Sequence, residues 1–252
     1  MRGFIVMAMF AVSLSHAGSQ KYTEVRNLEV DASGLSEVFI DAGAGAMMVT
    51  GIEGSNEVVV VATITVDTND ANEGAEFIED RLRLRLERDG DRAELKADFS
   101  PQWGWGTDAA VDLDVRMPAQ LALVIDDGSG PIAVEDISGN VTIDDGSGPI
   151  ELANSGDVDI DDGSGSISLE NTGAVKIDDG SGSITVVRAA GDVYVEDGSG
   201  TIDIRGVQGS VTVDDGSGDI EIDDVERDLI IEEEGSGSLR YTNVRGDVVR
   251  DD

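Results

Sequence analysis

The sequence predicts an all-β protein, a single-stranded β-helix (β-solenoid) with about 17–18 residues per coil and an N-terminal β-rich cap. Three observations predict this fold. The C-terminal half repeats a short motif seven times, each repeat alternates aliphatic and polar residues, and glycine-rich turns separate the alternating runs. Together they indicate short strands that stack coil upon coil.

The repeat begins at Ile125 and has the consensus D-D-G-S-G-x-I-x-V, followed by a second turn and G-x-V-x-I. Equivalent positions are 17 to 19 residues apart. Self-similarity at such a fixed period is typical of a solenoid, in which each unit contacts only its neighbours. The first glycines of the units are Gly128, Gly146, Gly163, Gly180, Gly198, Gly216 and Gly235.

Each unit carries two alternating runs, such as Ile132-x-Val134 and Val141-x-Ile143. A period of two places these aliphatics on one face of a strand and the intervening residues on the other. A single unit could not bury its aliphatic face, so stacked units must align equivalent residues into columns. One predicted column contains Ile132, Ile150, Ile167, Ile184, Ile202, Ile220 and Leu239. The outward positions form no regular array and are predicted to be solvated surface.

The motif Asp-Asp-Gly-Ser-Gly is predicted to be a corner of each coil. After Ile143 the chain must reverse within residues 144–148. Glycine adopts positive φ without steric cost, and Asp and Ser side chains can bond nearby backbone amides. The motif therefore contains the residue types that such a turn requires.

Residues 18–124 are predicted to form the N-terminal cap, which a solenoid needs to cover its otherwise unpaired edge. Residues 40–49 match the repeat position by position and are predicted to be a degenerate first coil. A helical turn is expected around residues 75–78 and a hairpin turn at residues 89–91. Strands are expected over residues 58–66, 81–86, 93–99, 111–116 and 121–125.

Composition excludes several classes of partner and site. The 252 residues include 53 acidic and 17 basic side chains, for a net charge of −36, which opposes binding to nucleic acid and to anionic membrane surfaces. The sequence has no Cys, which excludes disulfides and thiolate metal sites.

Residues 1–17 are predicted to be a cleaved signal peptide, because an apolar run ends in the small-residue pattern Ser15-His16-Ala17. The predicted organisation is this peptide, the cap over 18–124 and the seven-repeat solenoid over 125–252. The predicted location is exported, in the periplasm, on the cell surface or secreted, with no transmembrane segment after cleavage. Cleavage would remove His16, the single histidine, which excludes Ser-His-Asp and Cys-His catalysis.

The repeat unit, the degenerate IDAGAGAMMV copy and the Trp103–Gly106 loop before VDLDVRMPA together resemble a bacterial "putative adhesin" family, a domain of unknown function with DGSG β-strand repeats and a head-GIN-like β-helix. The resemblance spans nearly the whole mature chain. It implies a right-handed single-stranded β-helix and an adhesin-like role. It implies no catalytic residues.

Stacking is predicted to place the acidic corner residues in lines, where like charges about 4 to 5 Å apart repel by roughly 1 kcal/mol per pair even in water. Two interpretations stay open. Calcium could bind the carboxylates, although the turn departs from the G-G-x-G-x-D order of calcium-binding β-rolls. Alternatively, the aspartates cap turn amides and salt screens the remaining charge. The calcium candidates are Asp127, Asp145, Asp162, Asp179, Asp197 and Asp215.

The sequence favours a non-enzymatic, exported, adhesin-like β-solenoid that serves as a cell-envelope binding or scaffold protein, with an envelope, glycan or protein ligand. A calcium-responsive acidic envelope protein is the alternative. A glycan-active β-helix enzyme with a carboxylate pair is a third interpretation, but the short corners leave no loops to build a cleft. The repeated serines lack both a G-x-S-x-G elbow and a histidine base.

Overall fold

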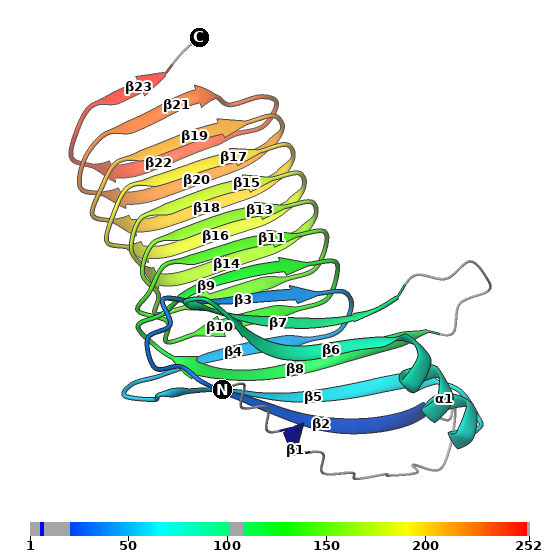
Figure 1. Ribbon diagram of the computed structural model, residues 1–252. Coiled ribbons are helices and arrows are strands. Elements are labelled where there is room, and N and C mark those ends of the chain that lie inside the picture. Colours follow the sequence, from blue (N-terminus) through cyan, green and yellow to red (C-terminus); the bar gives the residue numbers. More distant parts are fainter. Residues whose placement is uncertain (1–5, 8–20, 101–107, 251–252) are drawn as a thin grey trace.

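The computed structural model describes residues 6–7, 21–100 and 108–250, and it confirms the predicted solenoid. Successive strands of the chain alternate between two sheets, and the resulting coils stack along one axis. The N-terminal region lies across one end of this stack (Figure 1). In the described residues one sheet, sheet A, contains 12 strands and the other, sheet B, contains 11. No helix in this part of the chain is long and apolar enough to cross a membrane.

Sheet A pairs its strands in the order β1-β2-β5-β8-β4-β10-β12-β14-β16-β18-β20-β22. Its bounds are β1 Val6–Met7, β2 Lys21–Asp31, β5 Glu57–Asp67, β8 Ala109–Pro118, β4 Met47–Ile52, β10 Ile132–Glu135, β12 Ile150–Ala153, β14 Gly165–Thr172, β16 Gly182–Ala189, β18 Gly200–Val207, β20 Gly218–Val225 and β22 Leu239–Val244.

Sheet B pairs its strands in the order β23-β21-β19-β17-β15-β13-β11-β9-β3-β7-β6. Its bounds are β23 Val248–Arg250, β21 Leu229–Glu233, β19 Val211–Asp215, β17 Val193–Asp197, β15 Val175–Asp179, β13 Val158–Asp162, β11 Val141–Asp145, β9 Ala122–Asp127, β3 Glu37–Ala42, β7 Arg92–Phe99 and β6 Leu82–Asp89.

The predicted columns are in register from coil to coil. Ile150 pairs with Ile132 on one side and Ile167 on the other, and the alignment continues to Ile220 and Leu239. From Ile132 to Ile220 these side chains are at most 2% exposed. Parallel in-register pairing therefore buries identical aliphatics against one another, which is how the short repeat obtains a core.

The degenerate first coil consists of β3 and β4 and lies directly beside the first repeat. Ile40 pairs with Ile125, and Met47 pairs with Ile132. Between β4 and β9 the chain makes a long excursion whose strands β7 and β8 pair parallel with β3 and β4. Within the N-terminal region, the parallel stack thus extends one step beyond the first coil.

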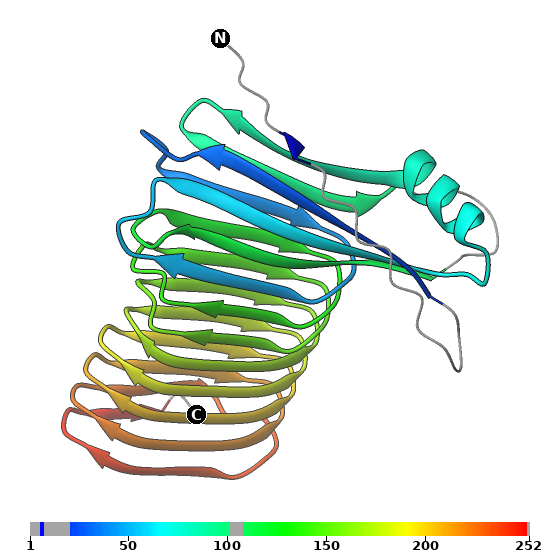
Figure 2. The same cartoon turned by 90° about the horizontal axis from the view of Figure 1, so that it is seen from below.

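Antiparallel strands end the stack. β6 pairs antiparallel with β7 in the predicted hairpin, while β5 pairs antiparallel with both β8 and β2. Figure 2 shows β2, β5 and β8 reaching past the coils towards the helix α1, Ala71–Arg81. This helix is longer than the predicted turn around 75–78, because Asp70 caps it through a 2.8 Å bond from the Asn72 N–H and Ile78 is buried.

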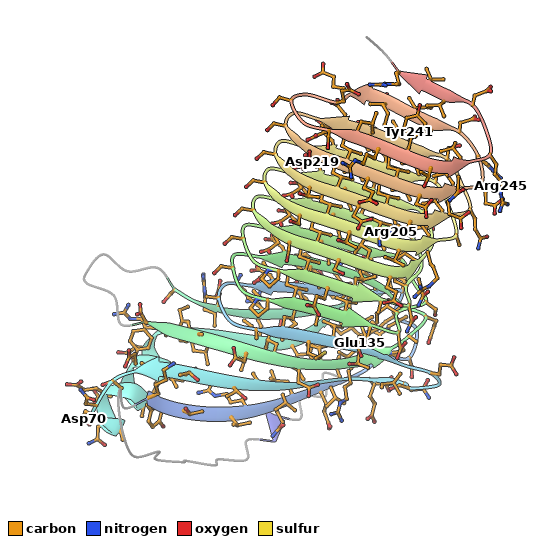
Figure 3. The ribbon with its side chains drawn as sticks, turned by 180° about the vertical axis from the view of Figure 1, so that it is seen from behind. Asp70, Glu135, Arg205, Asp219, Tyr241 and Arg245 are labelled. Atoms are coloured by element: carbon orange, nitrogen blue, oxygen red, sulfur yellow. The ribbon has the colours of Figure 1, made fainter. Side chains whose placement is uncertain are left out.

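The C-terminal coil is the exposed end of the stack. Tyr241 and Val248 occupy inward columns but are 39% and 38% exposed, since no coil covers them in the described residues. Arg245 contacts Glu226 and Arg250 contacts Glu234, so both of these basic groups at this end are paired with acidic ones. Tyr241 and Arg245 both lie at this end of the stack in Figure 3.

Candidate functional site

The acidic corner is where the strands of sheet B end. The first Asp of each corner points outward and the second points inward, so Asp144 is exposed while Asp145 is buried. The six calcium candidates all occupy the inward position, in register along the stack. Their exposed fractions lie between 0% and 5%: Asp127, Asp145, Asp162, Asp179, Asp197 and Asp215.

One oxygen of the inward carboxylate caps the turn. Oδ1 of Asp162 accepts a 3.1 Å hydrogen bond from the Ser164 N–H, and Asp197 accepts one of 3.0 Å from Ser199. Asp145, Asp179 and Asp215 make the same contact. This confirms the interpretation that the aspartates cap turn amides. The repeated serines are therefore held by their backbone N–H groups.

The second oxygen, Oδ2, has no hydrogen-bond partner among the described residues in any of the six aspartates, and it is inaccessible to solvent. A buried ionised oxygen without a partner is costly, because desolvation penalises the charged form. Burial is the main cause that raises the pKa of Asp127 to about 7, and the neighbouring charge of Asp145 adds to it. Burial likewise raises the pKa of Asp145, Asp179 and Asp197 to about 6.

The inward column therefore holds protons in a pH range where ordinary aspartates are ionised. Burial also raises the pKa of Asp162 and Asp215. In each case the backbone bond to the turn opposes the shift without cancelling it. A column of partly protonated acids reduces the like-charge repulsion that the sequence predicts for it.

The second glycine of each corner leaves no room beside the column. A Cβ on Gly165 would lie 1.8 Å from the carbonyl oxygen of Gly148 and 3.1 Å from Asp162 Oδ2. Among the described residues no three or more acidic or histidine side chains are grouped to hold a metal ion. Calcium prefers 6 to 8 oxygens, whereas each coil contributes one inward carboxylate to this column, and five of the six have one oxygen already bonded to the turn. Calcium binding at these six aspartates stays the alternative interpretation of the sequence, and the enclosed geometry of the column does not favour it.

The opposite corner contains a second ladder that sequence reasoning missed. The side chains form a chain of hydrogen bonds from coil to coil. Asn154 donates one of 2.9 Å to Asp136, Asn171 donates one of 3.0 Å to Asn154, and Arg188 donates one of 2.6 Å to Asn171. All four residues have φ between 56° and 61°. Asn and Asp tolerate this left-handed conformation better than other non-glycine residues, so their recurrence one coil apart was the available signal.

A shallow groove lies on the outer face of sheet B, across β13, β15, β17 and β19, with a volume of about 290 Å³. Its polar and aromatic lining consists of Asp157, Lys176, Asp192, Tyr194, Ser210 and Thr212. This volume is close to the lower end of small-molecule sites, roughly 300–1,000 Å³. The groove brings carboxylates, a cation, an aromatic ring and hydroxyls together on one outer face.

Comparisons with known proteins give distant similarities in structure alone. No family model matches the sequence, and no curated protein matches it. A solved structure named "putative adhesin", from Bacteroides fragilis, is 11% identical, with 90% of this chain and 97% of that chain covered and a TM-score of 0.43. One named "putative cell adhesion protein", from Clostridium sporogenes, is 9% identical, with 90% and 98% covered and a TM-score of 0.34.

A third similar structure, named "putative lipid binding protein" and from Parabacteroides distasonis, is 13% identical, with 90% and 94% covered and a TM-score of 0.44. These similarities concern the path of the chain. The Trp103–Gly106 loop of the family resemblance lies outside the described residues.

Proposed function

We propose that this chain is a non-enzymatic, exported, adhesin-like β-solenoid that serves as a binding or scaffold protein of the cell envelope. The observation that carries the proposal is the contrast between its inner and outer residues. Inner columns repeat the same aliphatics coil after coil, while the outward residues beside them change at almost every coil, as in Thr142, Asp159, Lys176 and Tyr194. A rigid ladder that leaves its surface free to vary suits recognition.

Chemistry supports a binding role over a catalytic one. The single histidine is His16, in the predicted signal peptide, so a serine of the corners has no imidazole base. The six inward aspartates are sealed inside the turn and cannot reach a substrate. Export is supported by the apolar N-terminal run and its small-residue cleavage pattern.

Fractionation combined with binding tests this proposal. The full-length protein, expressed in a bacterial host, is expected to lose its first 17 residues and to reach the envelope or the medium. The purified mature chain is expected to bind envelope preparations and to release no product from a polysaccharide panel. Retention in the cytoplasm would contradict export. Turnover lost on replacing one Asp pair would identify an enzyme instead.

A further inference from the structure

The groove on sheet B coincides with the places where the repeat departs from its own pattern. Across residues 125–252 there is one lysine, Lys176, and the aromatic residues are Tyr194 and Tyr241. Lys176 and Tyr194 occupy the same outward column in neighbouring coils and pair directly. The buried core of a solenoid does not dictate the residue types at such outward positions, so packing of the interior does not account for their adjacency.

Two carboxylates frame the groove and are held in place by the coil that follows each of them. Asp157 Oδ1 accepts a 2.9 Å hydrogen bond from the Ala174 N–H, and Asp192 Oδ1 accepts one of 2.8 Å from the Ser210 N–H. Each uses Oδ1 for this bond to the next coil, and among the described residues the other oxygen has no hydrogen-bond partner, which leaves it available to a ligand. Because the backbone fixes both groups, little side-chain entropy is lost when they bind.

Ala174 opens the space between these carboxylates. It stands in the same column as Asn140 and Asp157, one coil after Asp157 and one before Asp192, and it has the smallest side chain of the four. The groove is lined here by Ala174 and by the edges of Val158, Val175 and Val193. A ligand can therefore settle between two carboxylates against an apolar floor.

The remaining wall supplies an aromatic face and further polar groups. Tyr194 is half-buried, and its hydroxyl lies 3.4 Å from Glu196. Lys176 is exposed, and its Nζ lies 3.7 Å from Asp159 Oδ1. The ammonium group has three N–H donors, so it can also donate to a ligand. Ser210 and Thr212 complete the lining with hydroxyls.

We propose that this groove binds an uncharged pyranose residue of a glycan, an inference that rests on the proposed binding function and specifies its ligand class. Sugar hydroxyls donate to the free oxygens of Asp157 and Asp192 and accept from Lys176, while the C–H face of the ring packs on Tyr194. The net charge of −36 and the two framing carboxylates repel uronate and sulfate groups, which excludes acidic glycans.

The test uses the whole mature chain and soluble oligosaccharides of neutral glucans, mannans, galactans and chitin, with oligouronates as the acidic arm. Ligand-observed NMR and calorimetry are expected to detect a neutral oligosaccharide and no oligouronate. Tyr194→Ala is expected to weaken that binding roughly tenfold or more. Ala174→Asn, which places at 174 the residue type found at 140, is expected to fill the groove and abolish binding without unfolding the coil.

Matched controls separate the site from the fold. Asp192→Asn keeps the oxygen that accepts the Ser210 N–H but weakens a ligand contact, so binding is expected to fall. Asp228 makes the equivalent bond to the next coil, since its Oδ1 accepts a 2.8 Å hydrogen bond from the Asp247 N–H, but it lies outside the groove. Asp228→Asn is therefore expected to leave binding unchanged. Circular dichroism and thermal unfolding confirm that each variant is folded.

Three outcomes would overturn the proposal: no neutral oligosaccharide binds in the millimolar range, oligouronates bind better, or Tyr194→Ala and Ala174→Asn bind as the parent does. Binding to envelope preparations distinguishes failure of the groove proposal from failure of the proposed binding function. If the parent and Tyr194→Ala bind envelope preparations equally, the groove inference is wrong and the binding function stands. If the parent binds no envelope preparation, the proposed function itself is wrong.

Discussion

Asp145 and Asp162 pair directly across neighbouring coils, and each keeps its Oδ2 buried without a hydrogen-bond partner. Four further aspartates repeat this arrangement along the stack. The column places acids where water cannot solvate their charge, at about the 4.8 Å strand spacing. Proton uptake is the simplest way for such a column to lower its free energy.

Stability is therefore expected to depend on pH through this column. A carboxyl whose folded pKa is raised from 3.8 to about 6 or 7 contributes stability that is fully present below about pH 4 and is lost as pH rises through the folded pKa. The free energy of unfolding should therefore fall between about pH 4 and pH 7. Chemical denaturation at several pH values measures this directly.

Asp179→Asn isolates the effect of one group, because asparagine keeps the Oδ1 acceptor for the Ser181 N–H but cannot ionise. Relative to the parent, this variant is expected to gain on the order of 1–3 kcal/mol between pH 4 and pH 8. Asp178→Asn, at the exposed neighbouring position, is the control and should show a much smaller difference. If the free energies of unfolding of the parent and of Asp179→Asn changed in parallel with pH, Asp179 would not titrate in this range and this account would be wrong.

The inward columns are expected to dominate the stability of the coils. Ile184 is fully buried and pairs with Ile167 and Ile202. Ile184→Ala removes buried methyl groups and leaves a cavity, so a loss of roughly 2–5 kcal/mol is expected, against roughly 0.5–1.5 kcal/mol for Ile184→Val. Thr185→Ala, on the outward face of the same strand, should cost much less. Equal losses for Ile184→Ala and Thr185→Ala in urea unfolding would contradict this account.

The repeats were predictable because local pattern and global pairing coincide in them. A period of two sets the inward residues, the DDGSG motif sets the turn, and the constant unit length sets the register, as in Ile132 pairing with Ile150. Strand β2 was not predicted, because its buried positions include Glu24 and its alternation is broken. The parallel pairing of β7 with β3 joins segments about 55 residues apart, which no local signal specifies.

The corner site was predictable in part. Residue type indicated that the corner aspartates could cap turn amides, and in the structure Asp145 accepts a hydrogen bond from the Ser147 N–H. Burial of Oδ2 depends on how closely the next coil packs, which the sequence of one unit does not contain. Lys176 and Tyr194 belong to the outward positions that the sequence predicts to be solvated surface. The groove between them depends on how the side chains of four coils fit together, which the repeat pattern does not specify.

Glycine is required at the second glycine position of the corner because of close approach between coils. A Cβ at Gly165 would lie 1.8 Å from the Gly148 carbonyl oxygen, well inside contact distance. Gly165→Ala must therefore push two coils apart, and a loss of at least about 3 kcal/mol is expected. Gly54→Ala is the control: its φ of 73° is strained for alanine, but no atom lies within 4 Å, so about 1 kcal/mol is expected. Thermal and urea unfolding of both variants decide whether contact or backbone strain is the larger effect.

The negative charge of the inward aspartate column could be neutralised by protons or by a cation such as calcium. A ligand that binds only the folded chain, present at a concentration 100 times its dissociation constant, would add about 2.7 kcal/mol to the free energy of unfolding. In five of the six aspartates Oδ1 is bonded to the turn. At Asp162 the other oxygen is enclosed beside Gly165. We therefore expect millimolar calcium, compared with chelator at equal ionic strength, to leave the unfolding midpoint unchanged at pH 7. A rise that Asp162→Asn and Asp179→Asn abolish would instead show that calcium binds the inward column.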